Sequence, residues 1–367
     1  MSRFNAKSPL ILLSLSLLAF FSLDNFIFRS GFYDTYLADS YTGTVRLKIK
    51  YALKHVSSQK QNIFIPSASL MKAGLRLQDL ETNNPNAPFQ VIPLLLSGTK
   101  AYTQYHLLKE IDPYRNKFQF IIIPLESYKT LASFDPRDDT EYEEGLEIAS
   151  FLRIKEWFSF LKEHPNRQVQ YKLTQACLFS ARPYINDLER FIPSQRLRNN
   201  LRTDEEKYQY FYKGSAVSKS ISGLQIGSQN EILSCPFGKS FCHQVLKYDV
   251  PPLSIEKKQE ESEKVLAYEK TWLGKTISLY KNTPTKLIFL QMPHAFYETD
   301  RLPLPNAADI REQLPQQDNV QFIDENYFES LNHFEYMQDS QHLNEAGSKI
   351  FTEKLTELFY QLTQNNK

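Results

Sequence analysis

The sequence has little glycine and almost no net charge. Only 11 of its 367 residues are glycine, while 41% are hydrophobic and 13% aromatic, a composition that argues against fibrous and disordered chains. Its 43 basic and 42 acidic residues leave a formal charge of +1, so no overall field favours nucleic acid as a partner. No internal repeat occurs. A chain of this length and apolar content can bury a full core.

Cysteine is also scarce, and its three copies leave two alternatives open. Cys235 and Cys242 flank a Pro and Gly turn in the stretch SCPFGKSFCHQ, where they either close a small disulfide loop or remain buried thiols. Cys177 is then left without a partner. Cys235, Cys242 and His243 match no common spacing of zinc ligands. We therefore expect neither a metal nor a cofactor.

One long apolar run occurs, and it lies at the N-terminus. Residues 10–23 are apolar, and the polar pair at 24–25 interrupts the run before three more apolar residues. The whole of 9–28 approaches the ~20 residues that a membrane-spanning helix needs. No small-x-small cleavage site or lipobox cysteine follows the run. Residues 1–30 are therefore predicted to be an uncleaved membrane anchor; a cleaved signal peptide and a buried helix of a soluble protein are the alternatives.

Charges beside this run indicate its orientation. Arg3, Lys7 and the amino terminus precede the run, whereas Arg29 alone follows it. Positive charge tends to stay on the cytoplasmic side. We therefore expect a membrane-anchored chain whose remainder is extracytoplasmic, on the periplasmic or cell-surface side.

Further along the chain, short apolar runs alternate with helical patterns. Such runs suit strands that are buried on both faces, and their alternation with helices predicts a parallel sheet in an α/β fold. The predicted strands are 62–65, 91–96, 118–123, 286–292 and 320–323. Helices are predicted at 44–55, 102–111 and 255–280.

The strand pattern disappears in the middle of the chain. We therefore expect a first part of the α/β domain at 44–129, a mainly helical insertion at 130–255, and a second part of the α/β domain at 256–367. Apolar residues three and four apart predict one amphipathic helix at 146–164. The Ser- and Gly-rich stretch 213–230 predicts a mobile loop.

The stretch DSQHLNEAGSKIF, near the C-terminus, pairs Asp339 with His342 just before the last predicted helix. Asn344 suits the N-cap of that helix, because apolar residues recur with helical spacing after it. A three-residue spacing in a turn lets a carboxylate bond one imidazole nitrogen while the other nitrogen faces a cleft. This is the arrangement that a general base needs.

This block resembles the final block of the SGNH, or GDSL-type, hydrolases, in which an Asp-x-x-His supplies the orienting acid and the base. The resemblance implies a flavodoxin-like three-layer α/β/α sandwich with a central parallel sheet of about five strands. Residues 94–128 resemble further blocks of its membrane-anchored, extracytoplasmic branches, which are similar to alginate O-acetyltransferases and teichoic acid D-alanylation proteins and include an uncharacterised bacterial group. The resemblance runs from about residue 44 to the end, and the middle of the chain does not contribute to it.

In this family the nucleophile follows the first strand, here within IFIPSASLMKAGL at 63–75. Aligning SASL with Gly-Asp-Ser-Leu places Ser69 at the nucleophile. Aligning PSAS with Gly-Ser-Ser-x places Ala68 there and leaves a degenerate site. Ser67 is an alternative nucleophile.

The family's oxyanion donors follow the second and third strands. The resemblance implies that Gly98 offers its backbone N–H to the developing oxyanion. Glu126 or Ser127 stands where the family has an asparagine donor, and a carboxylate at that place would repel an oxyanion.

Two functions are therefore expected from the resemblance. The first is an envelope-anchored serine esterase or O-acyltransferase that acts on a cell-envelope glycan or polymer, with an acyl-carrying membrane partner as an implied donor. The second is a catalytically degenerate envelope binding or scaffold protein with the same fold.

Overall fold

A computed structural model describes residues 7–30, 41–67, 69–96, 100–125, 145–146, 148–149, 151–164, 167–184, 212–223, 225–226, 232–235, 255–294, 307–339 and 341–364. Its contacts divide the chain into two compact units. The first unit combines Met1–Lys50 with Arg137–Arg202, and the second combines Tyr51–Pro136 with Thr203–Lys367. The division falls within helix α2 (Tyr41–Lys54).

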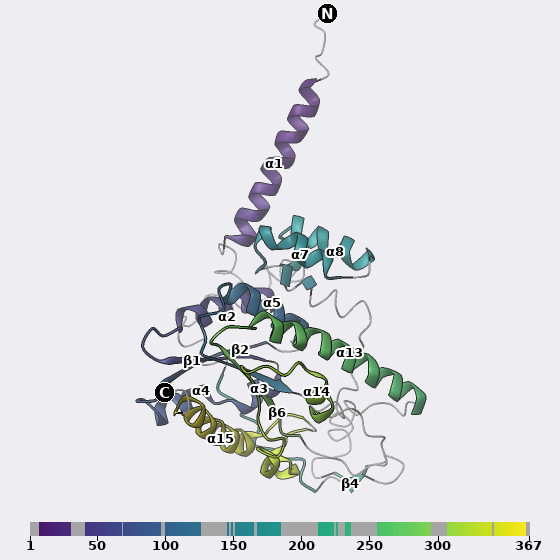
Figure 1. Ribbon diagram of the computed structural model, residues 1–367. Helices are drawn as coiled ribbons and strands as arrows, with labels where there is room; N and C mark the ends of the chain where they lie inside the picture. Colours follow the sequence, from purple (N-terminus) through teal and green to yellow (C-terminus); the bar gives the residue numbers. More distant parts are fainter. Residues whose placement is uncertain are drawn as a thin grey trace, which may run out of the picture. The chain divides into compact units, whose positions relative to one another are not determined.

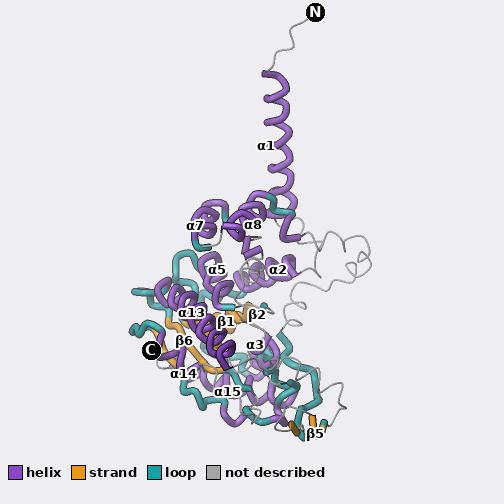
Figure 2. Tube along the Cα trace, turned by 90° about the vertical axis from the view of Figure 1, so that its right-hand side faces the viewer, coloured by secondary structure: helices purple, strands orange, loops and turns teal. Residues whose placement is uncertain are grey.

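The second unit is built on a five-stranded parallel sheet (Figures 1 and 2). Its strands are β1 (Gln61–Ser67), β2 (Phe89–Leu95), β3 (Phe120–Leu125), β6 (Lys286–Gln291) and β7 (Val320–Phe322). They lie in the order β2-β1-β3-β6-β7, and every neighbouring pair is parallel. Numbered along the chain this is 2-1-3-4-5, the order of flavodoxin-like folds. The predicted fold class is therefore confirmed.

Helices cover both faces of this sheet. They are α3 (Ser69–Gly74), α4 (Leu77–Asn83), α5 (Ala101–Ile111), α13 (Ile255–Leu279), α14 (Ala307–Gln313) and α15 (Glu345–Gln364). α15 packs against α3 and α4, whereas α13 packs against α5 and α14. The chain moves in one direction across the sheet from β1 to β2 and in the other direction afterwards, so right-handed crossovers place these two groups on opposite faces.

The core lies between these layers and follows from the apolar strands. All six residues of β3 are buried, and Phe64 of β1 stacks on Phe118 with ring centroids 4.4 Å apart. Full burial of one such aromatic side chain contributes about 1.5–3 kcal/mol. The five strands begin and end within two residues of their predicted limits. Four of them are mostly buried, and such runs carry a strong apolar pattern, whereas β7 is only partly buried.

The first unit is helical and begins with α1 (Lys7–Arg29). The segment Pro9–Arg29 is long and apolar enough to span a membrane, with a mean hydropathy of 2.0. The unit also contains the 3₁₀ turns η3 (Ile154–Glu156) and η4 (Arg182–Tyr184) and the helices α7 (Trp157–Lys162) and α8 (Arg167–Leu178). Figure 1 shows α7 and α8 beside the C-terminal end of α1.

Two charged residues tie this end of α1 to the rest of the unit. The backbone N–H groups of Ser180 and Ala181 donate to the Asp24 carboxylate at 2.5 and 3.0 Å. Arg29 donates to the carbonyl of Leu152 at 2.6 Å and to that of Cys177 at 3.0 Å. The polar residues at 24–25 therefore do not end the helix; they mark where the helix joins a folded unit.

The helix predicted at 146–164 is interrupted in the structure. Arg153 is extended, with φ −69° and ψ 145°, and the chain resumes as η3 and then α7. The carbonyl of Leu152 accepts a hydrogen bond from Arg29 instead of bonding the next helical turn. The apolar spacing therefore continues through a break in the helix, and Arg29 bonds the carbonyl of Leu152 that the break leaves free of the helix.

The predicted insertion at 130–255 is divided between the two units and is not helical throughout. Its residues 137–202 belong to the first unit, and its residues 130–136 and 203–255 belong to the second. β4 (Gln225–Ile226) and β5 (Ile232–Ser234) form a small antiparallel sheet there. Cys235 is disulfide-bonded and Cys177 is a buried free thiol. Cys242 and His243 lie outside the described residues.

Candidate active site

Ser69 opens α3 at the carboxyl end of β1. β1 ends at Ser67, and α3 is anchored in the core by the buried side chains of Leu70 and Met71. The Ser69 side chain remains partly accessible. In a sheet of this order the chain changes direction between β1 and β3, and ligands bind at the carboxyl ends of the strands around such a switch point.

Asp339 and His342 lie in a tight loop before α15. The N–H of Gln338 donates to the carbonyl of His342 at 2.9 Å, which closes the loop. The N–H groups of Gln341 and His342 both donate to Asp339 Oδ1, at 2.9 and 2.7 Å. Two backbone N–H groups of this loop therefore hold the Asp339 carboxylate in place, in addition to its contact with the His342 ring.

Asn344 connects the same loop to α15. Its Oδ1 accepts from the N–H of Gly347 at 2.9 Å, so Asn344 caps the helix as predicted. A Cβ at Gly347 would lie 2.4 Å from the carbonyl oxygen of Tyr336, so glycine is required for the close approach. The cap and the glycine hold the His342 loop against the start of the helix.

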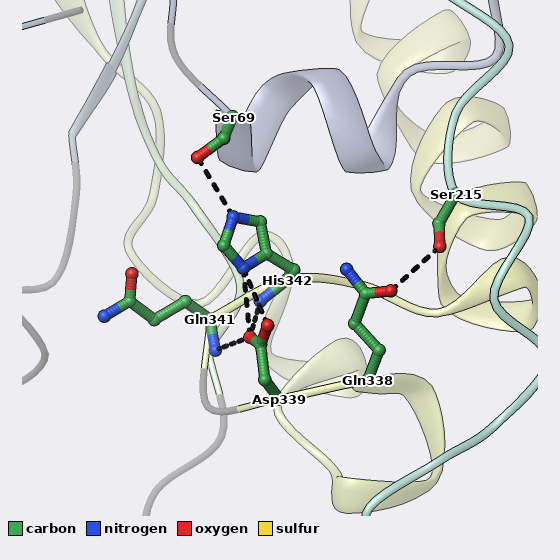
Figure 3. Close-up of polar contacts among 6 residues, drawn as sticks. All are labelled: Ser69, Ser215, Gln338, Asp339, Gln341 and His342. Atoms are coloured by element: carbon green, nitrogen blue, oxygen red, sulfur yellow. Dashed lines mark hydrogen bonds and ion pairs between the residues drawn. The ribbon is translucent and has the colours of Figure 1, made fainter. Parts of the chain in front are cut away.

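Three of the predicted residues form one chain of hydrogen bonds (Figure 3). His342 Nδ1 lies 2.9 Å from Asp339 Oδ2 and 3.1 Å from Oδ1. His342 Nε2 lies 3.0 Å from Ser69 Oγ. Ser69 and His342 are 273 residues apart in sequence, so the fold alone brings them together.

The charge of Asp339 fixes the direction of these bonds. Burial alone raises the pKa of Asp339, but the hydrogen bonds from His342 and the interaction with its charge outweigh burial, and the pKa is lowered. An ionised carboxylate only accepts, so Nδ1 carries the proton and Nε2 accepts from the Ser69 hydroxyl. The side chains of His342 and Asp339 are 27% and 21% exposed, which leaves the imidazole open to a substrate.

A strap formed by residues 212–221 crosses the site and bonds to both of its parts. On the side of α3 and α4, the N–H of Ser215 donates to the carbonyl of Ala73 and the N–H of Leu77 donates to the carbonyl of Tyr212, both at 2.8 Å. On the acid–base side, the N–H of Glu345 donates to the carbonyl of Val217 at 2.8 Å.

Two further bonds join the strap to the loop that carries Asp339. The N–H of Ile221 donates to the carbonyl of Met337 at 3.0 Å. Ser215 Oγ donates to Gln338 Oε1 at 3.3 Å (Figure 3). The stretch 213–230, predicted to be a mobile loop, thus makes several hydrogen bonds to the rest of the second unit over its described first part. Only its lack of a periodic pattern was readable from the sequence.

The other predicted site residues are placed as follows. Ser67 is buried as the last residue of β1, and its carbonyl accepts from the N–H of Leu96 at 2.8 Å. Of the two serines, it is Ser69 whose hydroxyl meets His342. The residues Ala68, Gly98, Glu126 and Ser127 lie outside the described residues, so the oxyanion donors remain predictions.

His294 also follows a strand of the sheet, at the end of β6, but it is buried in the core. It is 4% exposed, and its N–H donates to Asn332 Oδ1 at 3.0 Å. Within the described part of the chain, no group of three or more His, Cys, Asp or Glu residues is arranged to hold a metal ion. The chemistry that this site can support is that of its serine, histidine and aspartate. Comparison of the sequence with models of protein families and with curated proteins finds no match to either.

Proposed function

We propose that the chain is a serine esterase or O-acyltransferase of the SGNH-like type, anchored in a membrane by α1. The observation that supports this proposal is the continuous hydrogen-bonded chain from Asp339 through His342 to Ser69. A serine hydroxyl at 3.0 Å from an imidazole whose other nitrogen is held by a carboxylate is the arrangement of an activated nucleophile.

The proposed reaction proceeds in two steps. Ser69 Oγ attacks the acyl carbon of an ester while its proton passes to His342 Nε2, and Asp339 stabilises the imidazolium that forms. The tetrahedral intermediate then collapses, the ester bond breaks, and the leaving alcohol takes the proton from Nε2. Water or a hydroxyl of an acceptor next attacks the acyl-serine, again through His342. Water as acceptor gives an esterase, and an alcohol gives an acyltransferase.

The proposed substrate is an acylated glycan or polymer of the cell envelope. The apolar α1 would keep the site at a membrane, and the excess of positive charge before α1 favours an extracytoplasmic position for the rest of the chain. An acyl-carrying membrane partner would supply the acyl group if the acceptor is not water.

A fluorophosphonate probe tests the nucleophile. We expect the full-length protein in detergent to be labelled at Ser69, which peptide mass spectrometry would locate. Ser69→Ala should abolish labelling, and His342→Ala should reduce it ~10²- to 10⁴-fold, because the general base is lost. Ser67→Ala is the matched control, since Ser67 is two residues away and makes no bond to His342 among the described residues; its labelling should persist.

The competing function is a scaffold that keeps the fold without chemistry. Wild-type protein that resists the probe, or that is labelled equally well after Ser69→Ala, would reject the enzyme and favour the scaffold.

Once labelling is established, the acyl acceptor can be assigned. Release of acetate from p-nitrophenyl acetate in water, compared with transfer to an added oligosaccharide, separates esterase from transferase.

A further inference from the structure

The first unit exposes an unusual number of large apolar side chains outside α1. Five of them occur within a short segment of the described chain: Ile154 (64% exposed), Phe158 (80%), Tyr171 (66%), Leu178 (41%) and Phe179 (38%). We call these five residues the apolar face. Ile154 and Phe158 are four residues apart, and Tyr171 and Leu178 are seven apart on α8, so each pair shares one side of its helical segment.

One residue of the apolar face, Phe179, contacts the apolar surface of α1. The ring of Phe179 lies 6.3 Å from that of Phe20 and 5.3 Å from that of Phe21, both within the membrane-spanning candidate. One turn further along α1, Asp24 accepts from the backbone of Ser180 and Ala181, next to Phe179. Phe179 therefore lies at the same level along α1 as residues 20 and 21.

The length of α1 sets this level relative to a bilayer. From Lys7 to Leu23 the helix has 17 residues before the first acid, which at 1.5 Å per residue is about 25 Å. A hydrocarbon core is about 30 Å thick, so this stretch is no longer than the core itself. Residues 20 and 21 would then lie at the edge of the hydrocarbon, and Phe179 is held beside them.

Contacts at the end of α1 favour its retention. Phe28 packs against Tyr184 in a buried cluster, and Arg29 binds the carbonyls of Leu152 and Cys177. Removal of α1 as a signal peptide would take these contacts away from the first unit. α1 is therefore taken as a permanent part of the first unit.

Charges around the apolar face fit lipid head groups. Lys155, Lys162, Arg167, Lys172 and Arg182 are exposed in this unit. Its described acids in the same stretch, Glu156 and Glu163, are half-buried, and Glu156 pairs with Arg153 at 3.7 Å. Basic side chains around an apolar surface are typical of helices that lie in the interface of anionic membranes.

We propose that the apolar face enters the interface of the bilayer that α1 spans, so that the helical unit lies on the membrane with Phe158 and Leu178 in lipid. The exposed cations would contact anionic head groups. This proposal depends on α1 being inserted but not on any chemistry at Ser69, so the two proposals fail separately.

Site-directed spin labelling tests this proposal. Full-length Phe158→Cys, Leu178→Cys and Ser159→Cys variants, each with Cys177→Ala, would be labelled and placed in nanodiscs of phosphatidylethanolamine and phosphatidylglycerol. Ser159 is the matched control, because it follows Phe158, is exposed, and lies about 100° further round α7. The measurement is the relaxation of each label by oxygen, which concentrates in lipid, and by a water-soluble nickel chelate.

We expect labels at 158 and 178 to respond more to oxygen than to nickel, and the label at 159 to show the reverse order. Nickel access at 158 and 178 equal to that at 159 would place the apolar face in water and overturn the proposal. Shielding of 158 and 178 from both reagents would show a protein on this face and would overturn it as well. Phe158 is 80% exposed, so its replacement should leave the fold intact, which circular dichroism would check.

Discussion

Asp339 decides which nitrogen of His342 is available to Ser69. Its carboxylate accepts hydrogen bonds from Nδ1 at 2.9 Å and from two backbone N–H groups. Because Nδ1 is the donor, Nε2 is left as the acceptor for the serine hydroxyl. In Asp339→Asn the amide can offer its NH₂ group to Nδ1, which favours the wrong tautomer and removes the charge that stabilises the imidazolium. We expect fluorophosphonate labelling of Ser69 to slow ~10²- to 10⁴-fold.

Asp324→Asn is a matched control for this prediction. Asp324 is exposed and accepts from the N–H of Asn326 at 2.8 Å in a turn of the same unit, so the substitution changes the same charge away from His342. Its labelling rate should equal that of the wild type. Equal slowing by both variants would mean that charge in general, rather than the bond to His342, controls the reaction.

The same carboxylate should make stability depend on pH. The pKa of Asp339 is lowered in the folded protein, against about 3.9 in an unfolded chain. A lowered folded-state pKa stabilises the fold above the unfolded pKa, and this contribution is lost as the pH falls through the folded pKa. The difference in free energy of unfolding between wild type and Asp339→Asn should therefore shrink below about pH 4. Urea unfolding from pH 7 to pH 3 measures it, and a difference that grows on acidification would contradict the assignment.

At the scale of the elements, the strap bonds both to α3, which begins with Ser69, and to the loop that carries Asp339 and His342. Gly214 is the third residue of the strap and has φ +72°, and a Cβ there would meet Arg76 Cγ and Ser348 Oγ, both at 2.6 Å. Gly223 has a similar φ of +84° but no atom within 4 Å of its Cβ position. Both glycines thus have a left-handed backbone, but only at Gly214 would an added Cβ clash with neighbouring atoms.

Gly214→Ala and Gly223→Ala therefore form a matched pair. Both should lose about 1–2 kcal/mol from the left-handed backbone, and Gly214→Ala should lose a further 1–3 kcal/mol, roughly, from the overpacking. Labelling of Ser69 should fall only in Gly214→Ala, because Ser215 next to it bonds to Ala73 and Gln338. Thermal unfolding measures the loss of stability, and the fluorophosphonate probe measures the labelling of Ser69. Equal labelling in the two variants would show that the strap does not position the site.

These elements also show how far a sequence can predict a structure. The sheet was predictable because most of its strands are mainly apolar and buried, as Phe120 to Leu125 is over its whole length. The spacing of Asp339 and His342 is local, so their contact was predictable too. The strap and the break at Arg153 depend on partners far away in sequence, since Ser215 and Gln338 are 123 residues apart, as are Arg29 and Leu152. No local pattern carries such contacts.

At the scale of the whole molecule, the two units have separate means of stabilisation. In the first unit, Arg29 joins α1 to several other segments. It donates to the carbonyls of Leu152 and Cys177 and to Ser180 Oγ. Its guanidinium also lies 4.7 Å from the ring centre of Trp157. Cys177 reports on this unit, because it is a buried free thiol whose pKa burial raises to about 11, an effect that the charge of Arg29 partly offsets. In the intact unit it should react slowly with N-ethylmaleimide at neutral pH.

Arg29→Ala should open the first unit without changing the second. Each lost hydrogen bond from a charged donor costs about 1.5–3 kcal/mol, and every 1.4 kcal/mol changes an equilibrium about tenfold. Alkylation of Cys177 should therefore accelerate ~10- to 10³-fold. Labelling of Ser69 should stay at the wild-type rate, since Ser69, His342 and the strap all belong to the second unit. Lys155→Ala removes an exposed cation from the first unit and should change neither rate. A parallel fall in Ser69 labelling in Arg29→Ala would mean that the helical unit supports the site, and the two units would then have to be treated as one.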